Sequence, residues 1–266
     1  MIKFIIGDAM YKIISNNLIK DNVYMLEVEA PLLAHSIKPG EFIIIMVDSM
    51  SERIPMAVYD INGDNIIIVY SVSGASTHEL KNATSIHSLL GPLGNESSYT
   101  FNSELYIDKK VLLLVIGTGI AQVNRISKRL NELEIKNDIY SVDYSIFDDI
   151  KIIEKDNLRD LIKEYDSILT VGSFEFMENV VDISKDLNKE VRVSLSPLML
   201  DGIGLCGACR VLIDGEIKFA CTDGPEFDGT KVDFDTAKKR MELFKTEEGR
   251  RYLREVEGNT FTGGRA

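Results

Sequence analysis

Short apolar runs separated by turn residues occupy the N-terminal third of the chain. The runs at 24–29, 41–47 and 65–71 are rich in Ile, Val, Tyr and Phe, and Pro-Gly at 39–40 and Asn-Gly-Asp at 62–64 separate them. β-branched and aromatic runs bounded by such residues predict strands joined by turns. Several short strands at this spacing predict a small β-barrel.

From about residue 105 the period of the pattern changes. The apolar run 111–116 has the length of a buried strand, and a Gly-Thr-Gly turn follows it. Further strands are predicted at 138–144, 167–171 and 190–195, and helices at 120–133, 157–165 and 174–187. Strands that alternate with helices predict a parallel α/β sheet.

After residue 196 the pattern gives way to glycines and cysteines, and then to a charged segment, 235–256, that looks helical. In this segment Ala237, Met241 and Phe244 recur at helical spacing and form a narrow apolar stripe. The stripe is interpreted either as a docking face for a partner or as a face that packs on its own chain. The predicted division is a β-barrel at 1–104, an α/β domain at 105–196 and a third part at 197–266.

All three cysteines of the chain, Cys206, Cys209 and Cys221, lie in one window that opens with Asp201. The spacing D-x4-C-x2-C-x11-C is typical of a [2Fe–2S] ferredoxin-type loop with a distant fourth ligand. Asp201 stands where the first cysteine would be, and a carboxylate can ligate iron. The glycines between these positions let the backbone fold tightly and aim N–H groups at the ligands. The predicted ligands are therefore Asp201, Cys206, Cys209 and Cys221.

Three other interpretations of the cysteines remain open. Zinc accepts three thiolates with a carboxylate or histidine, but His35, His78 and His87 all lie far upstream. A disulfide is disfavoured because the N-terminus lacks the pattern of a signal peptide. Buried apolar cysteines are disfavoured by the tight grouping among glycines.

Composition narrows the class of protein. The chain has 266 residues, 45% of them hydrophobic, and a formal net charge of −12. This charge argues against nucleic acid and anionic membrane surfaces as partners, and no apolar run reaches the ~18 residues of a membrane span. Reduced cysteines without a targeting segment predict a cytoplasmic protein.

A barrel, an α/β domain and a [2Fe–2S] loop, in this order, resemble one branch of the ferredoxin reductase-like flavoproteins. The chain resembles the electron-transfer subunits of dihydroorotate dehydrogenase. It looks still closer to the small subunits of NADH-dependent reduced ferredoxin:NADP oxidoreductases, which are electron-bifurcating transhydrogenases. The resemblance is strongest at 194–210 and 219–228. Subunits of the dihydroorotate enzymes carry cysteine at the first ligand position and those of the transhydrogenases carry aspartate, so Asp201 favours the latter.

The resemblance implies an FAD site on the barrel. The family motif Arg-x-Pro/Tyr-Ser/Thr matches up to Ala57, which stands where a hydroxyl residue is usual. Arg53 is expected to pair with the FAD pyrophosphate, and a second segment at a helix start to bind phosphate through N–H groups and hydroxyls. The implied FAD residues are Arg53, Pro55, Met56, Ala57, Gly74, Ala75, Ser76 and Thr77.

The nicotinamide site departs from the family pattern. The family carries a run close to Gly-Gly-Gly-x-Gly-Ile-Ala after the first α/β strand. Here Val115 and Ile116 replace the first two glycines, and Glu175 adds a negative charge near the expected pyrophosphate. NAD(H) is therefore a candidate cofactor whose binding is expected to be weakened or lost. The residues left to hold it are Gly117, Thr118 and Gly119.

The resemblance implies an oxidoreductase subunit of the ferredoxin–NAD(P) reductase type. Such a subunit relays electrons between NAD(H), FAD and a [2Fe–2S] cluster to a larger subunit with its own flavin and [4Fe–4S] clusters, and ferredoxin is a further candidate partner. No catalytic side chain is assigned, because the redox chemistry belongs to the cofactors. One alternative is the electron-transfer subunit of a dihydroorotate dehydrogenase. Another is a non-catalytic metal-bearing regulatory or scaffold subunit.

Overall fold

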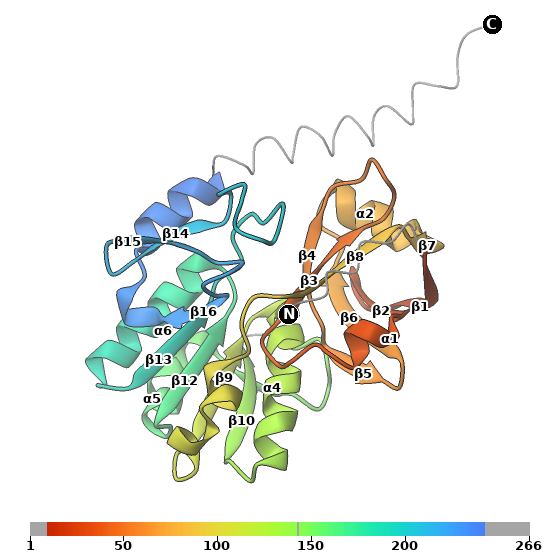
Figure 1. Ribbon diagram of the computed structural model, residues 1–266. Coiled ribbons are helices and arrows are strands. Elements are labelled where there is room, and N and C mark those ends of the chain that lie inside the picture. Colours follow the sequence, from red (N-terminus) through yellow and green to blue (C-terminus); the bar gives the residue numbers. More distant parts are fainter. Residues whose placement is uncertain (1–9, 143, 243–266) are drawn as a thin grey trace, which may run out of the picture.

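The computed structural model describes residues 10–142 and 144–242. A β-barrel forms one side of the molecule and a parallel α/β sheet the other, with the cysteine-rich segment at one end of the sheet (Figure 1). This arrangement agrees with the fold class expected from the alternation of strands and helices.

The N-terminal part consists of two antiparallel sheets around one core. One sheet has the order β5-β6-β2-β1-β7 and the other the order β4-β3-β8. The strands are β1 (Tyr11–Lys20), β2 (Val23–Glu29), β3 (Phe42–Met46), β4 (Ile54–Ala57), β5 (Asp60–Asn62), β6 (Asn65–Ser71), β7 (Ser85–Ile86) and β8 (Ser88–Leu93), and the helices are α1 (Pro31–Ala34) and α2 (Ala75–Asn82). Leu26, Ile43 and Ile68 point inward from three strands and are fully buried.

The second part is a six-stranded sheet in the order β11-β10-β9-β12-β13-β16, and only β16 runs antiparallel to its neighbour. The strands are β9 (Val111–Val115), β10 (Asn137–Val142), β11 (Lys151–Ile153), β12 (Ser167–Val171), β13 (Glu190–Ser194) and β16 (Glu226–Asp228). The helices are α3 (Ser98–Phe101), α4 (Ile120–Glu132), α5 (Leu158–Lys163) and α6 (Phe174–Asp186), with 3₁₀ turns at Ser103–Tyr106, Gly117–Gly119, Lys155–Asn157 and Gly229–Lys231.

Strand β9 is apolar on both faces because each face is covered. Leu112 and Leu114 belong to the core that includes α5 and α6, whereas Leu113 belongs to the core that includes α4. Val23 and Val69 of the barrel join this second core, and α4 accordingly lies between the sheet and the barrel (Figure 1). The barrel and the α/β sheet thus share one packed interface.

The cysteine-rich segment is built into the α/β sheet. It contains the hairpin β14 (Arg210–Ile213) and β15 (Glu216–Phe219), and its last strand, β16, pairs with β13. Residues 234–242 are helical, which agrees with the start of the helix predicted at 235–256. The rest of that segment, including Phe244, lies outside the described residues.

The apolar stripe of this helix packs inward. Ala237 is 4% exposed, and Met241 packs against the same core as Val211 and Phe234. Of the two interpretations of the stripe, packing on its own chain is therefore correct for Ala237 and Met241, which hold the helix on the cysteine-rich segment.

Candidate functional site

A large cleft lies between the barrel and the carboxyl ends of the parallel strands. Its volume is about 660 Å³, which falls in the usual range for small-molecule sites. In open α/β sheets ligands bind at this edge, where the strand order reverses. The lining includes Pro55, Met56, Ala57 and Thr77 from the barrel and Gly117, Thr118, Gly119, Gly172, Ser173, Ser194 and Ser196 from the sheet. The structure thus brings two sequence-predicted sites into one cavity.

The remaining FAD residues lie beside this cleft without lining it. Arg53 is exposed and directly precedes β4, and Gly74 caps α2, which begins at Ala75. The Ser76 hydroxyl donates to the Glu52 carboxylate at 2.5 Å, which places Arg53 and the start of α2 side by side. Glu52 brings a negative charge to the position expected for a phosphate, a feature that the motif did not reveal.

The loop after β9 keeps its tight turn. Gly117 has a φ of +55°, and a Cβ added at Gly119 would lie 2.9 Å from the Val171 carbonyl oxygen. The backbone conformation therefore favours glycine at 117, and the lack of space for a Cβ favours it at 119. Val115 is fully buried in the core, whereas Ile116 is 39% exposed and lines the cleft. Of the two residues that replace the family glycines, only Ile116 therefore presents its side chain to the cleft.

Two features near this loop were not expected from the sequence. Within the described residues, the Gln122 Oε1 atom is buried and accepts no hydrogen bond. Tyr144 donates to the Asp21 carboxylate at 2.8 Å, and Lys20 donates to the Ser145 carbonyl at 2.8 Å. The loop after β10 is thereby tied to the β1–β2 turn.

The loop that begins at Asp201 turns through backbone conformations that favour glycine. Gly202, Gly204 and Gly207 have φ values of +72°, +81° and +67°. The Asp201 carboxylate accepts hydrogen bonds from the N–H groups of Ile203 at 3.0 Å and Cys206 at 2.5 Å. Burial raises the pKa of Asp201, but these N–H donors outweigh it and the net pKa is lowered. The carboxylate is therefore ionised at neutral pH, as an iron ligand must be.

The three thiols are free and sit at two depths. Cys209 and Cys221 are 1% exposed, and their sulfur atoms are 3.1 Å apart. Cys206 is exposed, and its sulfur accepts a hydrogen bond from the N–H of Ala208 at 3.4 Å. Burial, and then the hydrogen bond and charge of Cys209, raise the pKa of Cys221 to about 12. The four predicted ligands thus form an outer pair, Asp201 and Cys206, and an inner pair, Cys209 and Cys221.

Two pairs of ligands suit a two-iron cluster better than a single ion. In a [2Fe–2S] cluster the four protein ligands are shared between two irons, whereas structural zinc needs four ligands converging on one point. The donor set and its division therefore fit a [2Fe–2S] cluster.

The loop at 201–209, the cluster loop, rests on the barrel. A Cβ added at Gly202 would lie 2.6 Å from Leu93 Cδ1 and 2.8 Å from Ile44 Cδ1. Ile44 of β3 is paired with Pro55 of β4, and Pro55 lines the cleft. A single pair of strands thus separates the cluster loop from the cleft.

Comparison with known proteins agrees with this geometry. Residues 196–233 match the model of the iron–sulfur cluster binding domain of dihydroorotate dehydrogenase B. The dihydroorotate dehydrogenase B (NAD(+)) electron transfer subunit homolog of Thermotoga maritima is 33% identical, over 93% of this chain and 96% of that protein. The chain belongs to the family of dihydroorotate dehydrogenase B electron transfer subunits and their homologues. An uncharacterized protein in the adh 3′ region of Clostridium beijerinckii is 35% identical, over 96% of this chain and 97% of that relative.

Solved structures agree with this assignment. A chain of the NADH-dependent reduced ferredoxin-NADP oxidoreductase has a TM-score of 0.79 and 30% identity, and the match covers 95% of this chain and 100% of that chain. The ferredoxin reductase of carbazole 1,9a-dioxygenase shares the fold with a TM-score of 0.53 at 11% identity. These comparisons confirm the predicted family, fold class and electron-transfer role, and they support FAD and an iron–sulfur cluster as cofactors. Within the part of the chain that the structure describes, no helix is long and apolar enough to cross a bilayer.

Proposed function

We propose that this chain is the electron-transfer subunit of a two-subunit oxidoreductase of the ferredoxin–NAD(P) reductase type. It holds FAD in the cleft between barrel and sheet, and a [2Fe–2S] cluster at Asp201, Cys206, Cys209 and Cys221. The observation that carries this proposal is the contact of Gly202 with Ile44, because it sets the cluster loop against the strands that line the cleft. Two redox centres held this close can exchange electrons.

The barrel residues would bind and orient the flavin. Pro55, Met56 and Ala57 present a short wall of β4 to the cleft. Arg53, beside the start of α2, would meet the pyrophosphate as a fork of donors. For this to happen the Ser76 hydroxyl must exchange the Glu52 carboxylate for a phosphate oxygen.

The cluster loop would divide its ligands by depth. When bound, a flavin accepts a hydride and releases single electrons, and an iron–sulfur cluster carries one electron at a time. The inner pair, Cys209 and Cys221, is shielded from water, and the outer pair, Asp201 and Cys206, is at the surface. The loop thereby excludes water on its inner side and leaves the other side open for electron exit.

The exit side of the loop carries an apolar surface. Leu205, next to Cys206, is 83% exposed, and Leu200 and Ile203 are also exposed. Large exposed side chains around a redox centre favour a protein partner. We assign this surface to the larger subunit, which carries its own flavin and [4Fe–4S] clusters in the proposed complex, with ferredoxin as a further candidate partner.

A second candidate is the electron-transfer subunit of a dihydroorotate dehydrogenase. The match of residues 196–233 and the names of several relatives favour it. Purification of the complex from its native cells separates the two candidates. A partner with flavin and [4Fe–4S] clusters supports the first candidate, and a partner that oxidises dihydroorotate supports the second.

The cofactor assignment is tested by the visible spectrum and the metal content of anaerobically purified protein. We expect flavin and iron–sulfur absorption together, with two irons per chain. Arg53→Ala should release flavin, whereas Arg129→Ala, which removes a surface arginine paired with Glu132, should not. Zinc without iron would refute the cluster assignment, and full flavin content in Arg53→Ala would refute the role of Arg53.

A further inference from the structure

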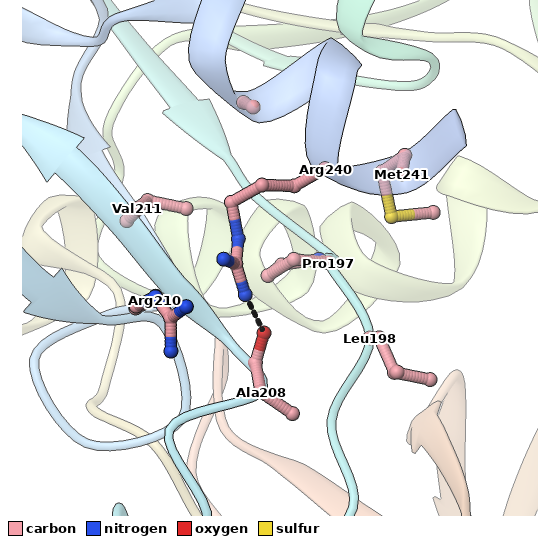
Figure 2. A pocket seen from close by; sticks show the side chains of 8 residues that line it. Pro197, Leu198, Ala208, Arg210, Val211, Arg240 and Met241 are labelled. Atoms are coloured by element: carbon pink, nitrogen blue, oxygen red, sulfur yellow. Dashed lines mark hydrogen bonds between the residues drawn. The ribbon is translucent and has the colours of Figure 1, made fainter. Parts of the chain in front are cut away.

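Two arginines bind the turn between Cys206 of the outer pair and Cys209 of the inner pair. The Arg210 guanidinium donates to the Gly207 carbonyl oxygen at 3.3 Å. The Arg240 guanidinium, which reaches over from the C-terminal helix, donates to the Ala208 carbonyl oxygen at 3.0 Å (Figure 2). The carbonyl groups of Gly207 and Ala208, the two residues between Cys206 and Cys209, therefore each accept a hydrogen bond from a guanidinium.

These contacts fix the direction of the N–H groups. In a trans peptide the C=O and the following N–H point to opposite sides. Because the Gly207 carbonyl faces Arg210, the N–H of Ala208 faces the Cys206 sulfur, which it contacts at 3.4 Å. By the same rule the Ala208 carbonyl, held by Arg240, directs the N–H of Cys209 away from that guanidinium.

Arg240 is packed rather than free in solvent. Its neighbours are Pro197, Leu198, Val211 and Met241 (Figure 2). The space left among these side chains is about 10 Å³, which has room for one water molecule at most. Burial, and then the charge of Arg210, lower the pKa of Arg240, whereas the charge of Cys209 raises it. An arginine nevertheless remains protonated, so its positive charge stays next to the cluster loop.

The two charges lack acidic partners. Within the described part of the chain, neither Arg210 nor Arg240 forms an ion pair with a carboxylate. A partly buried cation is normally neutralised by a nearby anion. The anion that this site would supply is the cluster with its thiolate ligands.

We propose that Arg210 and Arg240 are positioning residues that raise the reduction potential of the cluster. They orient the turn so that its N–H groups face the cluster, and their charges favour the form that has gained an electron. Hydrogen bonds to sulfur and local charge are the protein's main means of setting this potential. The step concerned adds one electron, taken from the reduced flavin, and no proton. The inference rests on the proposed function, since it requires a cluster at this loop.

The test is a redox titration of the intact holoprotein, with the cluster followed by electron paramagnetic resonance. Arg240→Gln should lower the reduction potential of the cluster by ~59 mV, which corresponds to a tenfold change in the one-electron equilibrium constant. Arg240→Lys should recover part of the loss because the charge is kept. Lys239→Gln is the matched control, since it removes an exposed charge from the adjacent position, and it should leave the potential unchanged. The flavin potential should not move in any variant.

An unchanged cluster potential in Arg240→Gln with full iron content would overturn the inference. If that variant loses iron, the cluster potential of Arg210→Gln tests the inference instead, because Arg210 is exposed and its replacement leaves the packing intact. A lower potential in Arg210→Gln supports the inference, and an unchanged potential overturns it. Wild-type protein without iron would instead refute the proposed function, so the two failures are distinguishable.

Discussion

Single glycines determine where the cluster loop can lie. Gly202 combines a φ of +72° with distances below 3 Å from an added Cβ to Leu93 and Ile44. Gly202→Ala should therefore lower the free energy of unfolding by about 1–2 kcal/mol from the backbone alone, with the steric clash in addition. It should also lift the loop from the barrel and slow reduction of the cluster by the flavin. Thermal melting and stopped-flow absorbance measure the two effects.

Gly63→Ala serves as the control, because Gly63 also has a positive φ, +60°, but has no atom within 4 Å of an added Cβ. It should show the stability loss without the change in electron transfer. Equal electron-transfer rates in the two variants would contradict the role given to the Gly202 contact.

The thiols should differ in reactivity once the metal is removed. The thiolate is the reactive form of cysteine, and the pKa of Cys221 is raised to about 12 by burial and by Cys209. Cys206 is exposed. In metal-free protein at pH 8, iodoacetamide should therefore label Cys206 first and Cys221 last, as read by mass spectrometry. Labelling of Cys221 as fast as Cys206 would show that the inner pair is not buried without its cluster.

Residue spacing was enough to predict the ligand set but not its surroundings. Asp201, Cys206 and Cys209 stand close in sequence, so their spacing alone predicts a common loop. Arg240 reaches Ala208 from 32 positions away, and no periodicity connects such residues. Ser194 and Ser196 line the cleft, and they could have been found, because they stand at the carboxyl end of a predicted strand.

At the scale of elements, uniformly apolar strands and amphipathic helices were predicted well. Strands β9 and β12 and helices α4 and α6 lie within a residue or two of the expected ranges. Strand β1 was missed because two adjacent asparagines, which are uncommon in strands, interrupt its apolar residues. Strands β15 and β16 were missed because each has at most four residues and is held by pairing rather than by its own composition.

The C-terminal helix should be necessary for the cluster. Ala237 is 4% exposed and lies in the same core as Val211. Ala237→Asp therefore places an unpaired charge in an apolar contact and should lower the free energy of unfolding by about 3 kcal/mol or more. Iron content should fall with it, because the helix no longer packs against the core that contains Cys209 and Cys221. Lys239→Asp, at an exposed position, should keep both iron and stability. Iron analysis and thermal melting measure the iron content and the stability of the two variants. An undiminished iron content in Ala237→Asp would show that the loop holds its cluster without the helix.

At the scale of the whole molecule, one carboxylate joins the three parts. Glu226 of β16 pairs with Arg192 of β13 and accepts hydrogen bonds from Ser97, at 2.6 Å, and Ser98 in the connection from the barrel. Its side chain is 9% exposed and that of Arg192 is 25% exposed.

Glu226→Gln should therefore lower the free energy of unfolding by about 3 kcal/mol, the low end of the range for breaking a buried pair. Chemical denaturation measures this loss. Glu216→Gln, which breaks an exposed pair with Lys218, should change it by about 0–1 kcal/mol. Equal losses in the two variants would contradict the joining role of Glu226.

The cleft as a whole determines whether NAD(H) is used. The carboxyl edge of the sheet keeps Gly117 and Gly119, but Ile116 projects into the cleft, and Asp21 is the charged residue of the lining. A pyrophosphate that approaches this edge meets an apolar side chain and no cation. Wild-type protein should therefore bind NAD(H) weakly, and Ile116→Gly should strengthen binding by about tenfold, or ~1.4 kcal/mol.

Val115→Ala is the control, because Val115 lies in the core and its truncation opens no space in the cleft. Calorimetric titration with NADH compares the three proteins. Micromolar affinity in the wild type would show that the loop tolerates Ile116, and the ordinary dehydrogenase half-reaction would then belong to this subunit.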